Sequence, residues 1–292
     1  MKEFLRLFIP PIYYRIKNKI FKYDIVYPKL NNQHTRTSQK LLIIGNGPSL
    51  NESIEKYFDV FDQYEKLSVN FFSSSELYTK IKPDIYVMVD PLFFKNKENI
   101  GEAADKVIHH LKNDTNWSLH VVLPVSAKES YLVEQISNNS CITVGFYNDR
   151  NYPIGNMSKF EAWDHNYLLP PSQNVLNVCT YLALFWNYPE TYIIGADTTF
   201  VQNLVVDQET NEIFSLERHF YNNDSVYSSD PWLDKKSRRR KVNNKMHEEL
   251  NCIKRALENY WTIRDYADYK GLKIYNASEY SWIDAFERRK LT

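Results

Sequence analysis

The 292-residue sequence is poor in cysteine and glycine, with three Cys and seven Gly. A small scaffold held together by disulfides needs more cysteine, so we predict that Cys141, Cys179 and Cys252 are reduced core residues of a cytosolic protein. No apolar run approaches the roughly 20 residues that a membrane-spanning helix requires. Basic and acidic residues both number 36, so the net charge gives no information about an acidic partner.

Three familiar nucleotide and metal signatures are also missing. The glycine-rich stretch at residues 45–50 is not Gly-x-Gly-x-x-Gly, because its sixth position is Leu50, and no Gly-Lys-Ser/Thr follows it. A dinucleotide fingerprint and a P-loop are therefore excluded. Nucleotide-sugar enzymes that hold a divalent cation commonly carry Asp-x-Asp, and this sequence has no such triplet. We expect no metal site and no bound cofactor.

The first 30 residues form a distinct segment. Within residues 1–23, basic side chains alternate with apolar ones at roughly helical spacing, and Glu3 is the single acidic residue. This pattern predicts a basic amphipathic helix that makes a peripheral contact with an anionic membrane, interrupted at Pro10 and Pro11. The alternative is a helix packed on the protein's own surface.

Residues 40–292 predict an α/β fold. Short runs of β-forming residues alternate with helical patterns, which is typical of a Rossmann-like, mostly parallel sheet flanked by helices. We expect helices at 49–61, 104–113 and 175–187 and a late helix through residues 250–261. The expected strands are 40–45, 66–72, 84–90, 119–124, 142–147, 191–197 and 272–278.

One segment, about 199–245, breaks this alternation. It is polar and irregular, and it follows the carboxyl end of an expected strand, where open α/β sheets bind ligands. Long irregular segments inside compact domains are usually functional or disordered. We predict a substrate lid, and the alternative is a solvated insertion.

The turn Gly45-Asn46-Gly47-Pro48-Ser49 follows the first expected strand and leads into a helix. Glycine lets the backbone approach a ligand closely, and a helix N-terminus offers free N–H groups to phosphate. The turn is therefore predicted to bind a nucleotide phosphate, and the alternative is an ordinary tight turn.

Polar residues end three further expected strands. Asn70 and Asp90 close two of them, and Gly195 and Asp197 close another, followed by Thr198. Parallel strands end on one edge of a sheet, so these residues are predicted to meet the glycine turn at one nucleotide-binding crevice.

Proton transfer has few candidates. Histidine is the usual general base for a sugar hydroxyl, and His247 begins the late helix, while His219 lies within the predicted lid. Tyr221 and Tyr227 are the aromatic candidates to stabilise a leaving phosphate. The basic run 235–241 has no interleaved aromatics, so we expect no nucleic-acid partner.

The motif LLIIGNGPSL resembles the opening of the bacterial, Campylobacter-type sialyltransferases of glycosyltransferase family 42, and other polysaccharide-cluster proteins share GNGPSL. The similarity continues through SVNFF, VMVDPLFF and YPETYIIGADTTF, and covers about residues 40–289. It implies a GT-A-like single domain that uses a CMP-linked donor without metal. It also implies nucleotide contacts at Asn70 and Asp197 and a catalytic histidine at His247. Asp90 replaces a family asparagine, and Asn174 lies where the family has a Ser/Thr segment.

These observations predict a glycosyltransferase of surface polysaccharide or lipopolysaccharide synthesis. It would transfer a sialic-acid-like sugar to a glycan or lipid-linked acceptor, at the inner face of the cytoplasmic membrane, as a monomer or a homo-oligomer. Two alternatives remain open. One is a phosphotransferase like the pterin pyrophosphokinases, which share a similar turn, and the other is a non-catalytic partner in a polysaccharide assembly complex.

Overall fold

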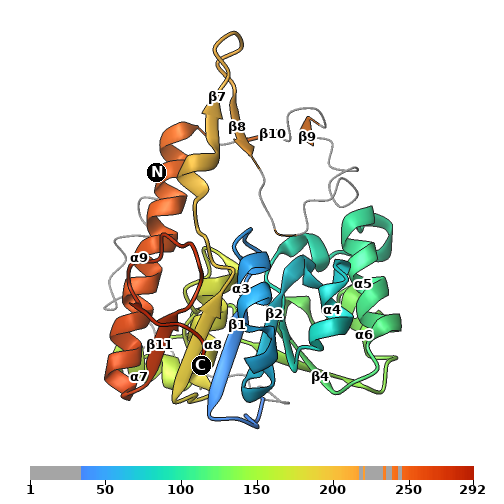
Figure 1. Cartoon of the computed structure of the whole chain (residues 1–292), viewed down its shortest axis with the longest axis vertical. Helices are drawn as coiled ribbons and strands as arrows, with labels where there is room; N and C mark the ends of the chain where they lie inside the picture. Colours follow the sequence, from blue (N-terminus) through green and yellow to red (C-terminus); the bar gives the residue numbers. More distant parts are fainter. Residues whose placement is uncertain (1–33, 217–219, 221–232, 235–238, 243–244) are drawn as a thin grey trace, which may run out of the picture.

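The computed structural model describes residues 34–216, 220, 233–234, 239–242 and 245–292. The predicted basic segment 1–30 lies outside these residues. Figure 1 shows one large sheet flanked by helices, with a smaller sheet beyond its upper edge, beside the N-terminal part of the long helix α9 (Met246–Lys270). The predicted α/β fold with a mostly parallel sheet is confirmed.

The main sheet has eight strands, and all of its strand pairs are parallel. Their spatial order is β12-β11-β6-β1-β2-β3-β4-β5, so β1 lies inside the sheet and the chain builds outward from it in two directions. The strands are β1 (Lys40–Ile44), β2 (Glu65–Val69), β3 (Ile85–Val87), β4 (Leu119–Pro124), β5 (Ile142–Tyr147), β6 (Glu190–Ile194), β11 (Lys273–Asn276) and β12 (Glu287–Arg288).

Helices cover both faces of this sheet because its central strands are apolar on both sides. Leu41 and Ile43 pack in one core cluster with residues of α8 and α9, while Leu42 and Ile44 pack in a second cluster with residues of α3, α5 and α6. Alternate residues of a strand point to opposite faces, so one continuous apolar run serves two cores. The further helices are α3 (Leu50–Tyr57), α4 (Leu77–Ile81), α5 (Glu102–Asp114), α6 (Tyr131–Ile136), α7 (Lys159–Asp164) and α8 (Val175–Phe185).

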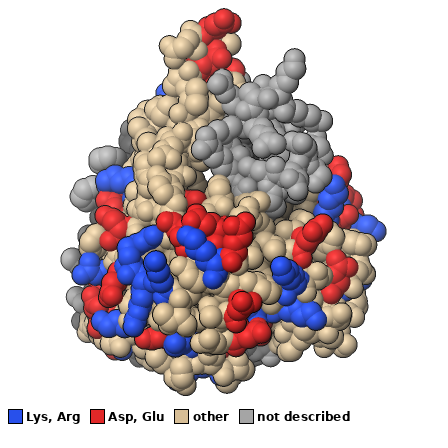
Figure 2. Space-filling view, in the orientation of Figure 1, with Lys and Arg blue, Asp and Glu red and all other residues tan. Residues whose placement is uncertain are grey.

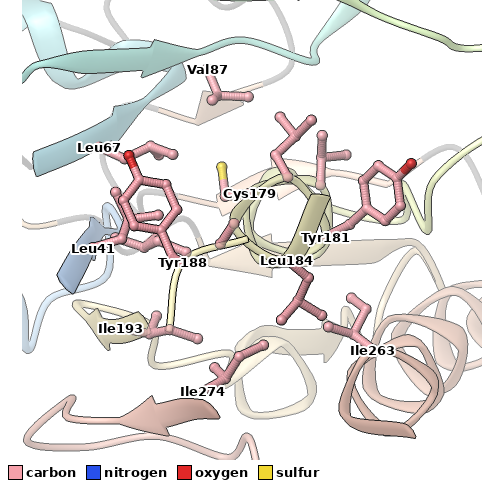
Figure 3. Packing of buried hydrophobic residues seen from close by; sticks show 14 of the residues in the cluster. Leu41, Leu67, Val87, Cys179, Tyr181, Leu184, Tyr188, Ile193, Ile263 and Ile274 are labelled. Carbon is pink, nitrogen blue, oxygen red and sulfur yellow. The ribbon is translucent and has the colours of Figure 1, made fainter. Parts of the chain in front are cut away.

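The central helix α8 is buried almost all round. Figure 3 shows it end-on, with Cys179 and Leu184 on different sides and strand residues such as Leu41 and Ile193 around it. Eight of its residues are buried, which explains why its sequence is apolar on every face. This helix fixes the distance between the sheet and α9, with which it also packs.

The segment predicted as an irregular excursion contains regular structure, and that part of the prediction is wrong. After a 3₁₀ helix, Phe200–Asn203, the described residues form a four-stranded antiparallel sheet in the order β7-β8-β10-β9. These strands are only two to four residues long, which is too short for an alternating pattern to reveal them. They are β7 (Leu204–Val206), β8 (Ile213–Leu216), β9 (Leu233–Asp234) and β10 (Arg239–Lys241).

Several boundaries also differ from the sequence predictions. The helix expected over 49–61 ends at Tyr57 and continues as a 3₁₀ helix, Phe58–Gln63. The strand expected over 66–72 ends at Val69, because Asn70 adopts a positive φ of 46° and turns the chain. Among the three cysteines, all free, Cys179 is buried and the other two are half-buried.

The polar stretch before β1 is held against the sheet. His34 and the backbone N–H of Thr37 both contact the Glu65 carboxylate. Among the residues that the structure describes, no helix has the length and apolar character needed to cross a membrane.

Candidate active site

The candidate site lies between two neighbouring strands, β1 and β6, whose following connections run to opposite faces of the sheet. β1 pairs with β6, and α3 after β1 packs on one face of the sheet, whereas α9, which follows the excursion after β6, packs on the other. In open α/β sheets, ligands bind outside the carboxyl ends of the strands at such a switch point. The turns that follow β1 and β6 therefore border the expected binding crevice.

These two turns pack directly against each other through glycine. The Gly47 N–H donates to the Gly195 carbonyl oxygen at 2.8 Å, and the Gly45 N–H donates to Ile194 at 2.9 Å. A Cβ on Gly45 would lie 2.4 Å from the Gly195 oxygen, and Gly195 itself has a φ of +61°. Only glycine fits this contact, so the glycines of the GNGPSL motif join two strand ends.

A carboxylate completes this junction at the start of α3. The Ser49 N–H lies 3.2 Å from Asp197 Oδ1, and the Ser49 hydroxyl donates to Asp197 Oδ2 at 2.8 Å. Both residues are buried. The negative end of this pair faces the helix N-terminus, where the peptide dipoles favour an anion.

This arrangement changes the role expected for the turn. The N–H groups of Gly45, Gly47 and Ser49 donate to acceptors within the protein, and Asp197 occupies the helix N-terminus that the sequence suggested for phosphate. Among the described residues, the Ser49 side chain makes no capping bond to its own helix. Nucleotide binding by these residues stays a prediction, whereas their structural task is visible.

The polar strand ends do lie together. β6, β1, β2 and β3 are consecutive neighbours in the sheet, so Asp197, Asn46, Asn70 and Asp90 follow four adjacent strands along one edge. Asn46 Nδ2 donates to the Val69 carbonyl at 3.2 Å, and Asn70 Oδ1 accepts from the Val89 N–H at 3.2 Å. These amides bridge each strand end to the next.

Asp90 uses its side chain locally. Its Oδ1 accepts from the Leu92 N–H at 3.0 Å and caps the short 3₁₀ helix Pro91–Phe93. Asn46, Asn70 and Asp90 are all half-buried, so each keeps part of its side chain on the edge of the sheet.

The end of β6 carries backbone strain. Thr198 has a φ of +53°, and it is the β-branched residue among the described non-glycine residues with positive φ. A β-branched residue in this region costs energy that the surrounding structure must offset. Such strain collects at binding sites, and here it lies beside Asp197.

Tyr260 contacts this strained turn from α9, which packs on the face of the sheet opposite α3. Its hydroxyl donates to Asn174 Oδ1 at 3.3 Å, and Asn174 in turn caps α8 by accepting from the Asn177 N–H. Burial raises the pKa of Tyr260, and hydrogen bonds to Asn174 and Thr198 partly oppose that rise. The phenol is therefore a neutral hydrogen-bonding group that links three elements.

The loop after β11 fastens the end of β6 from its outer side. The Ser278 hydroxyl accepts from the Ala196 N–H at 3.1 Å, and the Ser281 hydroxyl donates to the Ala196 carbonyl at 2.6 Å. The Trp282 N–H donates to the Asp197 carbonyl at 2.9 Å. These three bonds satisfy the Ala196 N–H and the carbonyl groups of Ala196 and Asp197, in the turn that follows β6.

One residue of the excursion touches the glycine turn. The Phe220 N–H donates to the Asn46 carbonyl at 3.1 Å, and Asn51 Nδ2 donates to the Phe220 carbonyl at 3.3 Å. Its ring lies 5.6 Å from that of Phe72. The excursion therefore contacts the candidate site at this point, as a lid would. The predicted residues His219, Tyr221 and Tyr227 lie outside the described part of the chain.

His247 is described, and it lies far from the strand ends. It is exposed in the first turn of α9, and thirteen residues separate it from Tyr260. At about 1.5 Å rise per residue, that is roughly 20 Å along the helix axis. Next to it is a surface hollow of about 530 Å³, lined by His247, Glu248, Asn251, Cys252 and Arg255.

Sequence reasoning missed Tyr260 and the serines of the last loop. Tyr260 lies on the apolar face of its helix, so the sequence predicts a core residue. Its site role could have been suspected only because a buried tyrosine hydroxyl needs a hydrogen-bond partner. Ser278 follows a strand end, the same signal that identified Asn70. Within the described residues, no group of three or more His, Cys, Asp or Glu side chains is placed to hold a metal ion.

Comparisons with known proteins find little. No protein family matches the sequence, and no curated protein matches it. Among solved structures, the chain is similar to a MAf glycosyltransferase from Magnetospirillum magneticum AMB-1, with 14% identity and a TM-score of 0.49. The similarity covers 91% of this chain and 36% of that protein, so this chain spans about a third of its length. A likeness at this level does not assign an activity.

Proposed function

We propose that this chain is a glycosyltransferase that binds a nucleotide-activated sugar at the carboxyl ends of β6, β1, β2 and β3. The observation that carries the proposal is the switch point itself, where polar residues end four adjacent parallel strands beside a glycine junction and a strained turn. This is the position at which open α/β sheets bind nucleotides.

The donor is proposed to be CMP-linked and sialic-acid-like. The support comes from the resemblance of the GNGPSL, SVNFF and IIGAD segments to family 42. The carboxamides of Asn46 and Asn70 offer both donors and acceptors to a pyrimidine base. Thr198, Asp90 and Asn174 border the same edge and would complete the nucleotide site.

The transfer step needs a base and a stabilised leaving group. The acceptor oxygen attacks the anomeric carbon, the bond from that carbon to the phosphate oxygen breaks, and the acceptor proton passes to His247, with His219 as the alternative base. Tyr221 and Tyr227 would donate hydrogen bonds to the departing phosphate. No metal or cofactor enters this scheme.

The position of His247 sets a condition on this scheme. Because α9 carries His247 roughly 20 Å beyond Tyr260, the sugar must extend from the strand ends toward the small sheet. The excursion would then close over the donor and exclude water, and its contact through Phe220 supports this role.

The setting is proposed to be surface polysaccharide synthesis. The basic segment 1–23 would hold the enzyme peripherally at the inner face of the cytoplasmic membrane, close to a lipid-linked acceptor. Self-association as a homo-oligomer is compatible with this arrangement and is measured by sedimentation of the purified chain.

A thermal-shift screen with CMP, CDP, UDP, GDP, ATP and pterin, each with and without EDTA, tests the proposal. A ligand that binds only the folded state stabilises it by about 2.7 kcal/mol at a hundredfold excess over Kd. We expect a shift with CMP that EDTA leaves unchanged. A shift with ATP and Mg²⁺ alone would identify a phosphotransferase instead, and binding of none of these ligands would favour a non-catalytic partner.

The base is tested separately. His247→Ala should lower the rate of sugar transfer at least a hundredfold while the CMP-induced shift persists, since a general base contributes about 10² to 10⁴ in rate. Transfer at the wild-type rate would remove His247 from the mechanism.

A further inference from the structure

A group of exposed aromatic side chains lies beside the candidate site and has no task in the scheme above. Phe200 is 43% exposed, Val201 40%, Tyr280 49% and Trp282 36%. We call these three aromatic residues and Val201 the aromatic shelf. Single exposed apolar residues are ordinary, but a cluster of them marks an interaction site.

Hydrogen bonds show that the shelf is one surface made of two segments. Phe200 and Val201 lie in the 3₁₀ helix after β6, and their neighbour Gln202 donates through Nε2 to the Tyr280 hydroxyl at 3.2 Å. Trp282 Nε1 donates to the same hydroxyl at 3.0 Å. The Tyr280 oxygen therefore ties both segments together at the centre of the shelf.

The shelf is fastened to the candidate site. The Trp282 N–H bonds to the Asp197 carbonyl, and the Ser49 hydroxyl lies 3.4 Å from the Tyr280 carbonyl. Ser281 lies between Tyr280 and Trp282 in the sequence. Its hydroxyl donates to the Ala196 carbonyl at 2.6 Å and accepts from the Ile283 N–H at 3.1 Å. The rings are therefore held in place before any ligand arrives, which lowers the entropy cost of binding.

The chemistry of the shelf fits a sugar ring. A pyranose has one face of C–H groups, which packs on an aromatic ring, and a rim of hydroxyls, which need polar partners. The shelf offers aromatic faces beside the Tyr280 hydroxyl, which accepts from Gln202 and Trp282 and keeps its own proton to donate. Rings of this type, apolar on the face and polar at the edge, suit a ligand that is amphipathic in the same way.

The shelf itself is uncharged, and the carboxylate next to it, Glu279, is paired with Lys56 at 2.7 Å. Figure 2 shows few charged side chains on the surface below β7, while acidic and basic side chains gather across the front of the main sheet. A membrane surface attracts basic clusters, and the four shelf residues carry no charge.

We propose that the aromatic shelf binds the acceptor glycan, with one sugar ring stacked on Trp282 and Tyr280. This proposal rests on the proposed function, because it gives the second substrate of the same site its place. An acceptor on the shelf would lie along the path from the end of β6 to the small sheet, because Phe200 and Val201 belong to the 3₁₀ helix that joins them.

Glycan binding is tested directly, without any donor. The purified full chain is applied to an array of immobilised neutral and acidic mono- and oligosaccharides, and the Kd of the best glycan is then measured by calorimetric titration. Trp282→Ala should weaken binding about tenfold or more, which is the loss expected for one stacked ring. Trp282→Phe, which keeps a stacking face, should weaken it less than Trp282→Ala.

Two further variants separate binding from folding. Tyr280→Phe removes only the hydroxyl that joins Gln202 and Trp282, and should weaken glycan binding about threefold to tenfold. Tyr269→Ala is the matched control, because Tyr269 is 57% exposed on α9, where its ring stacks with Tyr266 and lies tilted against Phe160. It should leave the glycan Kd within a factor of two.

The outcomes distinguish this proposal from the proposed function. If the wild type binds a glycan through Trp282 but gives no shift with any nucleotide, the shelf stands and the transferase falls. If CMP binds but no glycan does, or if Trp282→Ala and Tyr269→Ala behave alike, the shelf proposal is wrong. Binding to phosphatidylglycerol vesicles that Trp282→Ala abolishes, with no glycan bound, would replace the glycan by a membrane.

Discussion

The two edges of the main sheet carry polar groups of different kinds. At the amino edge, Glu65 is 3% exposed and meets Tyr188 Oη at 2.6 Å, His34 Nε2 at 2.9 Å and the Thr37 N–H at 2.9 Å. At the carboxyl edge, Asn46, Asn70 and Asp90 bridge strand ends and remain half-buried. The amino edge is sealed, whereas the carboxyl edge is presented to solvent.

Their electrostatics differ in the same sense. Burial alone would raise the pKa of Glu65, but hydrogen bonds from His34 and Tyr188 outweigh it and hold the pKa at about 2. Burial lowers the pKa of the neighbouring His120 to about 4, helped by His34 and opposed by Glu65. The polar groups of this network bond to one another, and they hold residues 34–37 against the sheet.

Backbone strain, in contrast, gathers at the carboxyl edge. Asn70, Thr198 and Gly195 have positive φ there, and Gly45 and Gly195 are in close contact. Strain of this kind persists where the surrounding structure enforces it and is common at binding sites. We therefore expect amino-edge substitutions to change stability alone, substitutions in the glycine junction to change stability most, and substitution of Asn70 at the carboxyl edge to change binding.

The largest effect is expected at the glycine junction. Gly195→Ala places a Cβ 2.7 Å from the Gly45 oxygen at a φ of +61°, so the free energy of unfolding should fall by about 3 kcal/mol or more. The measurement is urea unfolding followed by circular dichroism.

Gly155→Ala is the matched control for this substitution. Gly155 has a φ of +60°, but a Cβ there meets nothing within 4 Å among the described residues. Only the conformational cost remains, about 1–2 kcal/mol. Equal losses for the two variants would show that the junction is not closely packed.

The amino edge comes next. Glu65→Gln removes the charge that His34 and Tyr188 bind, and should lower the free energy of unfolding at pH 7 by about 2–3 kcal/mol. The lowered pKa of Glu65 stabilises the fold above about pH 4.5, and this contribution is lost as the pH falls toward 2. The variant should therefore lose less stability than the wild type over that interval.

Activity supplies the contrast for Glu65. Sugar transfer per folded molecule at pH 7 should be unchanged in Glu65→Gln. A stability curve as steep as that of the wild type between pH 5 and 2 would show that Glu65 is not the titrating group.

The Ser49–Asp197 pair should give a smaller change. Ser49→Ala removes the 2.8 Å hydrogen bond and should cost about 1–2 kcal/mol of unfolding free energy. A double-mutant cycle with Asp197→Asn isolates the coupling between the two side chains. Additive losses would contradict the junction described here.

The smallest change in stability is expected for Asn70→Gly. Glycine accepts the φ of 46° at Asn70 but removes the amide that bonds to the Val89 N–H. The unfolding free energy should change by less than about 1 kcal/mol, while CMP affinity falls about tenfold. The two are measured by urea unfolding and calorimetric titration. Unchanged affinity would remove Asn70 from the nucleotide site.

Much of the fold follows from sequence because its strands are buried on both faces. The strand at 119–124, buried at five of its six positions, has the predicted bounds, and so does the partly exposed edge strand at 142–147. The sequence Asn70-Phe71-Phe72 also resembles a strand, but the chain turns there because Asn70 has a positive φ. The apolar pattern of the sequence does not show such a φ, so this turn could not be predicted.

The site was predictable in part for the same reason. Strand-end logic placed Asn46, Asn70, Asp90 and Asp197 on one edge, and the topology brings them together there. It could not show that Asp197 would take the helix N-terminus, because that depends on the pairing of β1 with β6. The sequence predicted that His247 begins a helix. Its distance from the strand ends was not predictable, because that distance depends on where the 25-residue helix starts.

The central claim is that a nucleotide binds at the carboxyl edge and not elsewhere on the sheet. Amide hydrogen exchange with and without saturating CMP tests it most directly. We predict slower exchange in peptides covering residues 45–50, 69–74 and 195–203, and unchanged exchange in those covering 34–39 and 63–66. Protection at the amino edge, or none at the carboxyl edge while CMP is bound, would contradict the account.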